Sequence, residues 1–480
     1  MTKMSFGDRR LGRRQILQGT GATIGAGIVA PHLIFRGRAS AQDARIGKIN
    51  ATDVQKYSGA TVNLAVQKHT ATDAIQALAP HFEGQTGIKL NFEQIPQQQM
   101  DQKQRTDLAT GTGSYDVIGW FLNPEYVEND WITSVEELRA ETGSTDEALL
   151  AMDDFYEPFL GWNQYKGTLY GLPFYGESMM MYYNAEEMTQ VGITKAPETL
   201  AELEAACKAV KDAGRMAGIS LRGSQEGNAA VYPFLAWLYG HGGFWVNQGT
   251  GEIGLGNPES LEAANTWSHF LRDYGPPDVA SYFWNEVQLS MQQGKAAVIM
   301  DATNFGPRLE DPAQSNIAGK VGYALMPKVM GADGAPRGPE VSDGRFGHPA
   351  ISYGLSVPKS AKNPQAAWLF IQWATSREVM LETTKTGLRG DPTRQSSLDD
   401  PSFAENYNFG GGTWADTLKV SFGLGMNDYF PKESVTSAQL GDVLGLALSQ
   451  ILTGDKSPED ALGEAQTKSV DIQKQAGLLS

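Results

Sequence analysis

Hydrophobic and polar residues alternate along residues 61–67 and again along residues 88–95, which predicts two strands. Apolar residues recur at helical spacing along 72–84, residues 101–110 are also predicted to be helical, and residues 115–120 form a short apolar run typical of a strand. A strand–helix–strand–helix–strand order requires crossover helices between parallel strands. The pattern therefore predicts an α/β fold.

Helices later in the chain begin with recognisable capping sequences. Thr199 and Glu202 have the spacing of a capping box at the start of a helix over 199–214. Asn363-Pro364 precedes an apolar stretch, and Ser457-Pro458 combines a capping residue with a proline at the first helical position. Cys207 falls at an apolar position of the 199–214 helix, so we expect a buried thiol.

The first 41 residues have the features of an export signal. They hold seven basic residues and one acid, an apolar run over 19–35 follows the twin arginines, and a small-x-small sequence ends at Ala41. Arg13-Arg14 resembles the twin-arginine signal of bacteria. We expect cleavage after Ala41 and a periplasmic, water-soluble protein; the alternative is a disordered basic tail.

Composition and charge exclude several function classes. The net charge is −16, and removal of residues 1–41 makes it −22, which argues against nucleic-acid binding. A single cysteine excludes a disulfide framework and a cysteine-rich zinc site, and the histidines form no metal-binding pair, so we expect no cofactor and no metal. The Gly-x-Gly-x-x-Gly spacing at 249–254 precedes Pro258 and is interpreted as a turn or hairpin, with a helix from Pro258.

The aromatic content is the most informative part of the composition. The chain has 10 tryptophans, and several stand beside Gly, Asn, Glu or Pro, where loops are expected. Flat C–H faces and many hydroxyl groups make carbohydrates suited to an aromatic surface with carboxylate, amide and guanidinium partners. A sugar-like ligand is therefore one hypothesis for this chain, although each aromatic taken alone is also a candidate core residue.

An ordered set of sequence motifs resembles the extracellular solute-binding proteins of bacterial carbohydrate ABC transporters, the group that includes maltose-binding protein. The sequence YKGTLYGLPF at residues 165–174 is similar to a family segment where the chain passes between lobes. Other similar segments follow in the family's order at 82–90, 114–118, 181–184, 293–298 and 363–368. Residues 173–178, 274–277, 285–286 and 300–303 are similar to the mannitol and sorbitol branch.

The resemblance implies a two-lobe periplasmic binding protein fold with three crossings at a hinge and the ligand in the cleft between the lobes. It implies one lobe from 61–173 with 299–352 and a second from 177–296 with 356–480. The chain would be a monomer that captures a sugar or sugar alcohol and delivers it to the membrane permease of an ABC importer, without catalysis.

The resemblance also implies ligand-binding residues near the crossings and strand ends. They are Gln67, His69, Trp120, Glu177, Arg222, Trp245, Trp284, Asn285, Asp301, Tyr353 and Arg394. Glu177 is the strongest of these, because similar proteins place a ligand-binding carboxylate at the first crossing. A structural role is the alternative for His69, for Trp120 and for each residue from Arg222 onward.

Two other functions remain as hypotheses. One is an exported glycan hydrolase that uses two carboxylates distant in sequence. The other is a receptor of the same fold for a polyamine, iron or a phosphorylated compound. Tyr182 and Tyr183 are adjacent on a predicted strand and point to opposite faces, which argues against an iron pair there.

Overall fold

The computed structural model describes residues 46–120, 123–226, 229–387 and 389–479, apart from the side chains of Gln98 and Trp120. The predicted export signal lies outside these residues. Among the residues described, no helix is long and apolar enough to cross a membrane.

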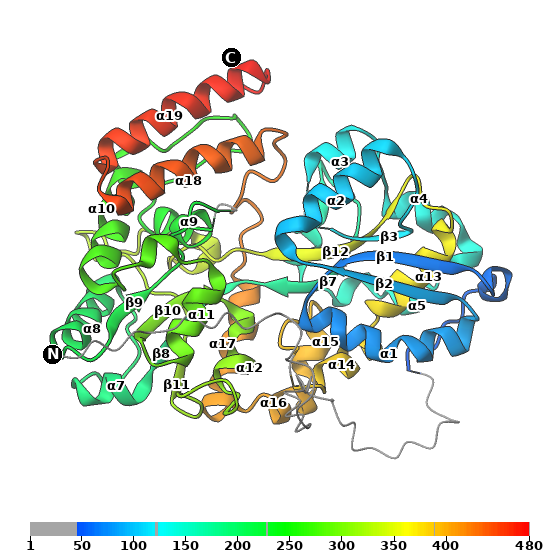
Figure 1. The fold of residues 1–480 in the computed structure, drawn as a ribbon, viewed down its shortest axis with the longest axis horizontal. Helices are drawn as coiled ribbons and strands as arrows, with labels where there is room; N and C mark the ends of the chain where they lie inside the picture. Colours follow the sequence, from blue (N-terminus) through cyan, green and yellow to red (C-terminus); the bar gives the residue numbers. More distant parts are fainter. Residues whose placement is uncertain (1–45, 121–122, 227–228, 388, 480) are drawn as a thin grey trace, which may run out of the picture. The chain divides into compact units, whose positions relative to one another are not determined.

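The first sheet carries the N-terminal part of the described chain (Figure 1). Its strand order is β2-β1-β3-β12-β4, and β7 also pairs with β12. The strands are β1 (Thr61–Gln67), β2 (Lys89–Ile95), β3 (Val117–Trp120), β4 (Ile132–Thr133), β7 (Leu172–Glu177) and β12 (Ile351–Pro358). β1 is parallel to β2 and β3, as the crossover pattern predicts, whereas β12 is antiparallel to β3, β4 and β7.

Helices predicted from the sequence cover this sheet. α1 (Thr70–Thr86) and α2 (Gln97–Thr110) contain the predicted helical ranges and begin two and four residues before them. α13 (Pro364–Ala374) starts at the predicted Asn363-Pro364 and packs on β12, α1, α4 and α5. The shorter helices of this part are α3 (Pro124–Glu128), α4 (Val135–Ala140), α5 (Glu147–Leu150), α6 (Glu157–Trp162) and α14 (Arg377–Thr384).

The second sheet has the order β11-β8-β10-β9. Its strands are β8 (Met179–Asn184), β9 (Ala217–Ser220), β10 (Ala296–Ala302) and β11 (Val321–Ala324). Helices near it are α7 (Ala185–Gln190), α8 (Leu200–Asp212), α9 (Val231–Gly240), α10 (Pro258–His269), α11 (Trp284–Gln292), α12 (Gly306–Leu309) and α17 (Thr413–Gly423). The C-terminal α18 (Ser437–Thr453) and α19 (Pro458–Gln475) pack side by side, orange and red in Figure 1. α15 (Gln395–Asp399) and α16 (Pro401–Asn406) connect α14 to α17.

Local predictions for the second part of the chain are confirmed. Thr199 and Glu202 form the capping box of α8, and Cys207 is fully buried in that helix. Around the 249–254 glycines, Val246 and Ile253 form an antiparallel bridge, and Gly251 has the φ of +74° that a tight turn requires. Pro258 is the first residue of α10. This glycine-rich segment is therefore a hairpin turn and not a nucleotide-binding loop.

The expected division of the chain between the lobes needs correction in its later half. β10 and β11, expected in the first lobe, pair with β8 in the second sheet, whereas β12 and α13 belong to the first. Every residue of β10 and of β12 is buried. Each of these strands pairs within a single sheet: β10 pairs with β8 and β9, and β12 pairs with β3, β4 and β7. The chain therefore passes from the second sheet to the first between β11 and β12, and not before β10.

Candidate functional site

Polar side chains gather where the chain passes from the first sheet to the second. Gln67 ends β1 and Glu177 ends β7, and β8 begins at Met179. The backbone of the intervening Ser178 is tied to the end of β10, because its N–H donates to Thr303 Oγ1 (3.2 Å) and its carbonyl accepts from the Thr303 N–H (3.0 Å). Residues of both sheets thereby meet at one place.

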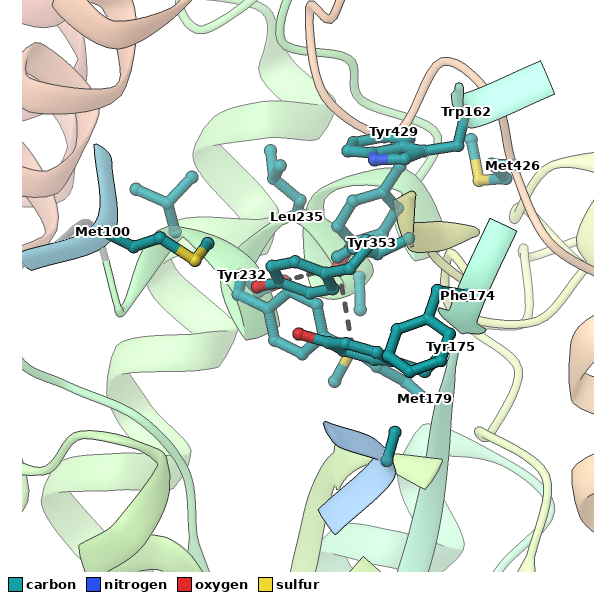
Figure 2. Close-up of a cluster of buried hydrophobic side chains, with 14 of the residues drawn as sticks. Met100, Trp162, Phe174, Tyr175, Met179, Tyr232, Leu235, Tyr353, Met426 and Tyr429 are labelled. Atoms are coloured by element: carbon teal, nitrogen blue, oxygen red, sulfur yellow. Dashed lines mark hydrogen bonds between the residues drawn. The ribbon is translucent and has the colours of Figure 1, made fainter. Parts of the chain in front are cut away.

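Three stacked aromatic rings lie beside the point where the two sheets meet. Tyr175 and Tyr353 are opposite one another in the β7–β12 pairing, with ring centroids 4.7 Å apart, and Figure 2 shows the two rings face to face. His69 stacks on Tyr175 at 4.2 Å and an interplanar angle of 10°. The Tyr175 hydroxyl donates to Gln67 Oε1 (2.6 Å), and Gln97 Nε2 donates to the Tyr353 hydroxyl (3.0 Å). The rings are thus held by both stacking and hydrogen bonds.

The second sheet contributes a buried ion pair. Arg222 follows β9, and its Nε donates to both carboxylate oxygens of Asp301 on β10, at 3.1 and 2.9 Å. Asp301 is fully buried, and the guanidinium carbon lies 4.3 Å from the ring centre of Tyr232 on α9. Among the described residues, no acceptor pairs with Arg222 Nη1. One edge of the guanidinium is held by the carboxylate, and the other keeps a free donor.

Glu177 lies between these two groups. Asn304 Nδ2 donates to its Oε1 at 2.8 Å, which is the one hydrogen bond that this carboxylate accepts from the described side chains. Burial raises the pKa of Glu177 to about 7; Arg222 opposes this shift, and Asp391 and Asp301 add to it. The carboxylate therefore has unused acceptor positions, and no cation of the described residues forms an ion pair with it.

Six of the predicted site residues come together here: Gln67, His69, Glu177, Arg222, Asp301 and Tyr353. Trp245 and Arg394 lie elsewhere. Trp245 is 1% exposed within the hydrophobic core. The Arg394 guanidinium donates to the Ala151 carbonyl (2.9 Å) and the Leu150 carbonyl (2.7 Å), so its donors are used inside the protein.

The three remaining predicted residues are not joined to the site by a hydrogen bond or ion pair of the described side chains. Trp284 and Asn285 begin α11, where the Trp284 ring is 6.4 Å from that of Phe305 and Asn285 is exposed. Trp120 ends β3 as expected, but its side chain lies outside the described part of the structure. These residues remain predictions.

Sequence reasoning missed Tyr175, Tyr232, Asn304, Arg389 and Asp391. Strand alternation is a usable signal for Tyr175, because residues i and i+2 of a strand share a face and Glu177 is among the predicted residues. From the loop that carries Asp391, the sequence pointed to Arg394 and not to Asp391.

Among the described residues, no group of His, Cys, Asp and Glu side chains is arranged to hold a metal ion. The assembled groups are hydrogen-bond donors and acceptors suited to hydroxyl groups.

Comparisons with known proteins agree with this chemistry. The family model described as "Bacterial extracellular solute-binding protein" matches residues 68–381. The chain is 28% identical over 437 residues to a mannitol-binding protein of Pseudomonas aeruginosa, covering 87% of this chain and 94% of that one. It is 26% identical over 409 residues to an erythritol/L-threitol-binding protein of Mycolicibacterium smegmatis, covering 82% and 83%.

A solved structure has the same fold. It is an ABC transporter solute-binding protein from Agrobacterium radiobacter K84 in complex with ribitol. The TM-score is 0.74 and the identity 25%, with 86% of this chain and 98% of that one covered.

Proposed function

This chain belongs to the bacterial extracellular solute-binding proteins, and we propose that it captures a sugar alcohol, or a sugar of similar size, for an ABC importer. The relatives named for mannitol and for erythritol and L-threitol, and the similar structure with ribitol, support this ligand class. The observation that carries the proposal is the polar cluster itself. Glu177, Arg222 and the His69–Tyr175–Tyr353 stack bring acceptors, a cationic donor and ring hydroxyls together from both sheets.

The charge balance of the cluster favours an uncharged ligand. Asp301 neutralises Arg222, and Arg389 lies beside Asp391, so within the described part of the chain Glu177 is the carboxylate of this cluster without an ion pair. A ligand carboxylate or phosphate would lie near this unpaired charge and be repelled. Hydroxyl groups instead donate to it and accept from Arg222 Nη1, so each buried polar group gains a partner.

In this proposal the ligand brings the two lobes together and nothing is chemically changed. A ligand that touches both sheets stabilises the closed arrangement, because only differential affinity shifts such an equilibrium. The passages of the chain between the sheets, including Ser178, would act as the hinge. The closed protein would then deliver its ligand to a membrane permease from the periplasm.

A thermal-shift screen of the purified protein tests the proposal. The ligands are erythritol, ribitol, D-mannitol, maltose, spermidine and glycerol phosphate. We expect a polyol to raise the melting temperature, because a ligand at 100 times its Kd stabilises the folded state by about 2.7 kcal/mol. Glu177→Gln should reduce the shift, and Glu405→Gln, an exposed glutamate of α16, should leave it unchanged.

Other outcomes would replace the proposal. A shift with spermidine or glycerol phosphate alone would indicate a receptor for a charged solute. Turnover of a chromogenic glycoside, lost in Glu177→Gln, would indicate a glycan hydrolase that uses this carboxyl group as its acid.

A further inference from the structure

We propose that Asp391 and His69 together bind one hydroxyl group of the ligand, so that Asp391 determines specificity for a hydroxyl at that position. This inference rests on the proposed function. Asp391 lies in the loop after α14, far in sequence from His69 at the start of α1. The two side chains meet beside Tyr175, with His69 Nε2 and Asp391 Oδ2 3.7 Å apart.

The His69 ring is fixed in orientation and protonation. Its Nδ1 accepts a hydrogen bond from the Ala71 N–H (3.2 Å) at the start of α1, so the proton of the neutral ring lies on Nε2. Burial lowers the pKa of His69, although Asp391 opposes that shift, and this keeps the ring neutral near pH 7. Stacking on Tyr175 sets the plane of the ring. Nε2 is therefore a donor aimed toward Asp391.

Asp391 presents an acceptor without a partner. The residue is 1% exposed, and its Oδ1 accepts from Arg389 Nε at 3.3 Å. Within the described part of the chain, its Oδ2 accepts no hydrogen bond. The loop is anchored to β7, because the Gly176 N–H donates to the Asp391 carbonyl at 3.0 Å. A buried carboxylate oxygen left unpaired is unfavourable, and a ligand donor would relieve that cost.

The distance between the two atoms suits a bridging hydroxyl. At 3.7 Å, His69 Nε2 and Asp391 Oδ2 are too far apart for a good direct hydrogen bond. One oxygen placed to the side of this pair can lie about 2.8 Å from each, accepting from Nε2 and donating to Oδ2. A hydroxyl satisfies both at once, whereas a methyl group or a carboxylate satisfies at most one.

The site between His69 Nε2 and Asp391 Oδ2 also lies beside the rest of the polar cluster. Asp391 contributes to the raised pKa of Glu177, and Tyr175 lies between His69 and Tyr353 in the stack. A ligand hydroxyl at Asp391 would therefore belong to the same molecule that Glu177 and Arg222 hold.

The test uses D-mannitol and its 1-deoxy, 2-deoxy and 3-deoxy analogues, which by the two-fold symmetry of mannitol sample each kind of hydroxyl. Affinities are measured calorimetrically for wild type, Asp391→Asn and His69→Asn. In His69→Asn the new side chain retains helix capping at Ala71 but is too short to replace Nε2. In Asp391→Asn the amide oxygen remains with Arg389, so the amide presents a donor to the hydroxyl in place of the carboxylate acceptor. Asp416→Asn, an exposed change on α17, is the control.

We expect one deoxy analogue to bind wild type at least tenfold more weakly than D-mannitol. In Asp391→Asn and in His69→Asn, the ratio of the affinity for D-mannitol to the affinity for that analogue should fall toward one. The same ratio for the other two analogues should stay as in wild type, and Asp416→Asn should keep all three wild-type ratios. Equal ratios in wild type and in both variants would overturn the inference and leave the proposed function intact. If D-mannitol fails to bind and another polyol binds, the same comparison is made with the deoxy analogues of that polyol. If no polyol binds wild type, the proposed function fails and this inference fails with it.

Discussion

The protonation of Glu177 gives a stability prediction that needs no ligand. The pKa of Glu177 in the folded protein is about 7, against 4.5 for an ordinary glutamate. Between these two values the folded state binds more protons than the unfolded state, so stability falls as pH rises. The contribution of protonated Glu177 is fully present below about pH 4.5 and is lost as pH rises through about 7. At about 1.4 kcal/mol per pH unit, this interval corresponds to at most ~3 kcal/mol.

Glu177→Gln isolates this contribution. Glutamine stays neutral, so the variant lacks the cost of an ionised buried carboxylate at high pH. Urea unfolding of wild type and variant at intervals from about pH 5 to pH 8 gives the difference in free energy of unfolding. Over this pH range, we expect the free energy of unfolding of the variant to rise relative to that of wild type by up to ~3 kcal/mol. Other titrating groups are common to both proteins and cancel in the difference.

The exposed Glu405→Gln serves as control and should show no such trend. A difference between wild type and Glu177→Gln that stays constant across this pH range would refute the reasoning. With ligand present the same group gives a second readout. Polyol hydroxyls donate to the ionised form, so binding near neutral pH should release protons, measured as a buffer-dependent binding enthalpy that Glu177→Gln abolishes.

Three further predictions concern other parts of the structure. Arg222→Ala leaves the buried Asp301 carboxylate unpaired and should cost about 3–5 kcal/mol in urea unfolding, with loss of polyol binding in calorimetry; a smaller cost with binding retained would contradict the described ion pair. Gly390→Ala places a Cβ 2.5 Å from the Trp414 ring, so the melting temperature should fall by an amount equivalent to about 1–3 kcal/mol. Cys207 is fully buried and burial raises the pKa of its thiol, so a thiol reagent should modify it only after urea unfolds the protein, and rapid labelling of the native protein would exclude this placement.

Much of the fold was predictable because it is encoded in short stretches. The alternation over 61–67 gives the bounds of β1, and the capping boxes and prolines give the starts of α8, α13 and α19. Each of these signals involves neighbours within four residues, where local geometry and hydrophobic period act together.

The assignment of β10, β11 and β12 to lobes failed for a physical reason. All three are largely apolar strands, and nothing in their own sequences says which strands they pair with. That choice depends on partners such as β8 and β3, which are distant along the chain.

The site divides in the same way. Gln67 stands at the end of a predicted strand, and Glu177 and Tyr353 lie near the crossings that the family resemblance implies, so the sequence could point to these three positions. Asp391 reaches His69 only through the packing of the loop after α14 against β7. No local spacing in the sequence encodes that contact.

Calorimetric titration of the purified protein with D-mannitol, ribitol and erythritol tests the central claim most directly. We predict saturable one-site binding of at least one of these polyols, weakened at least tenfold in Glu177→Gln and unchanged in Glu405→Gln. Absence of binding by every polyol to the folded protein, or equal affinity in wild type and Glu177→Gln, would contradict a polyol site built around this carboxylate.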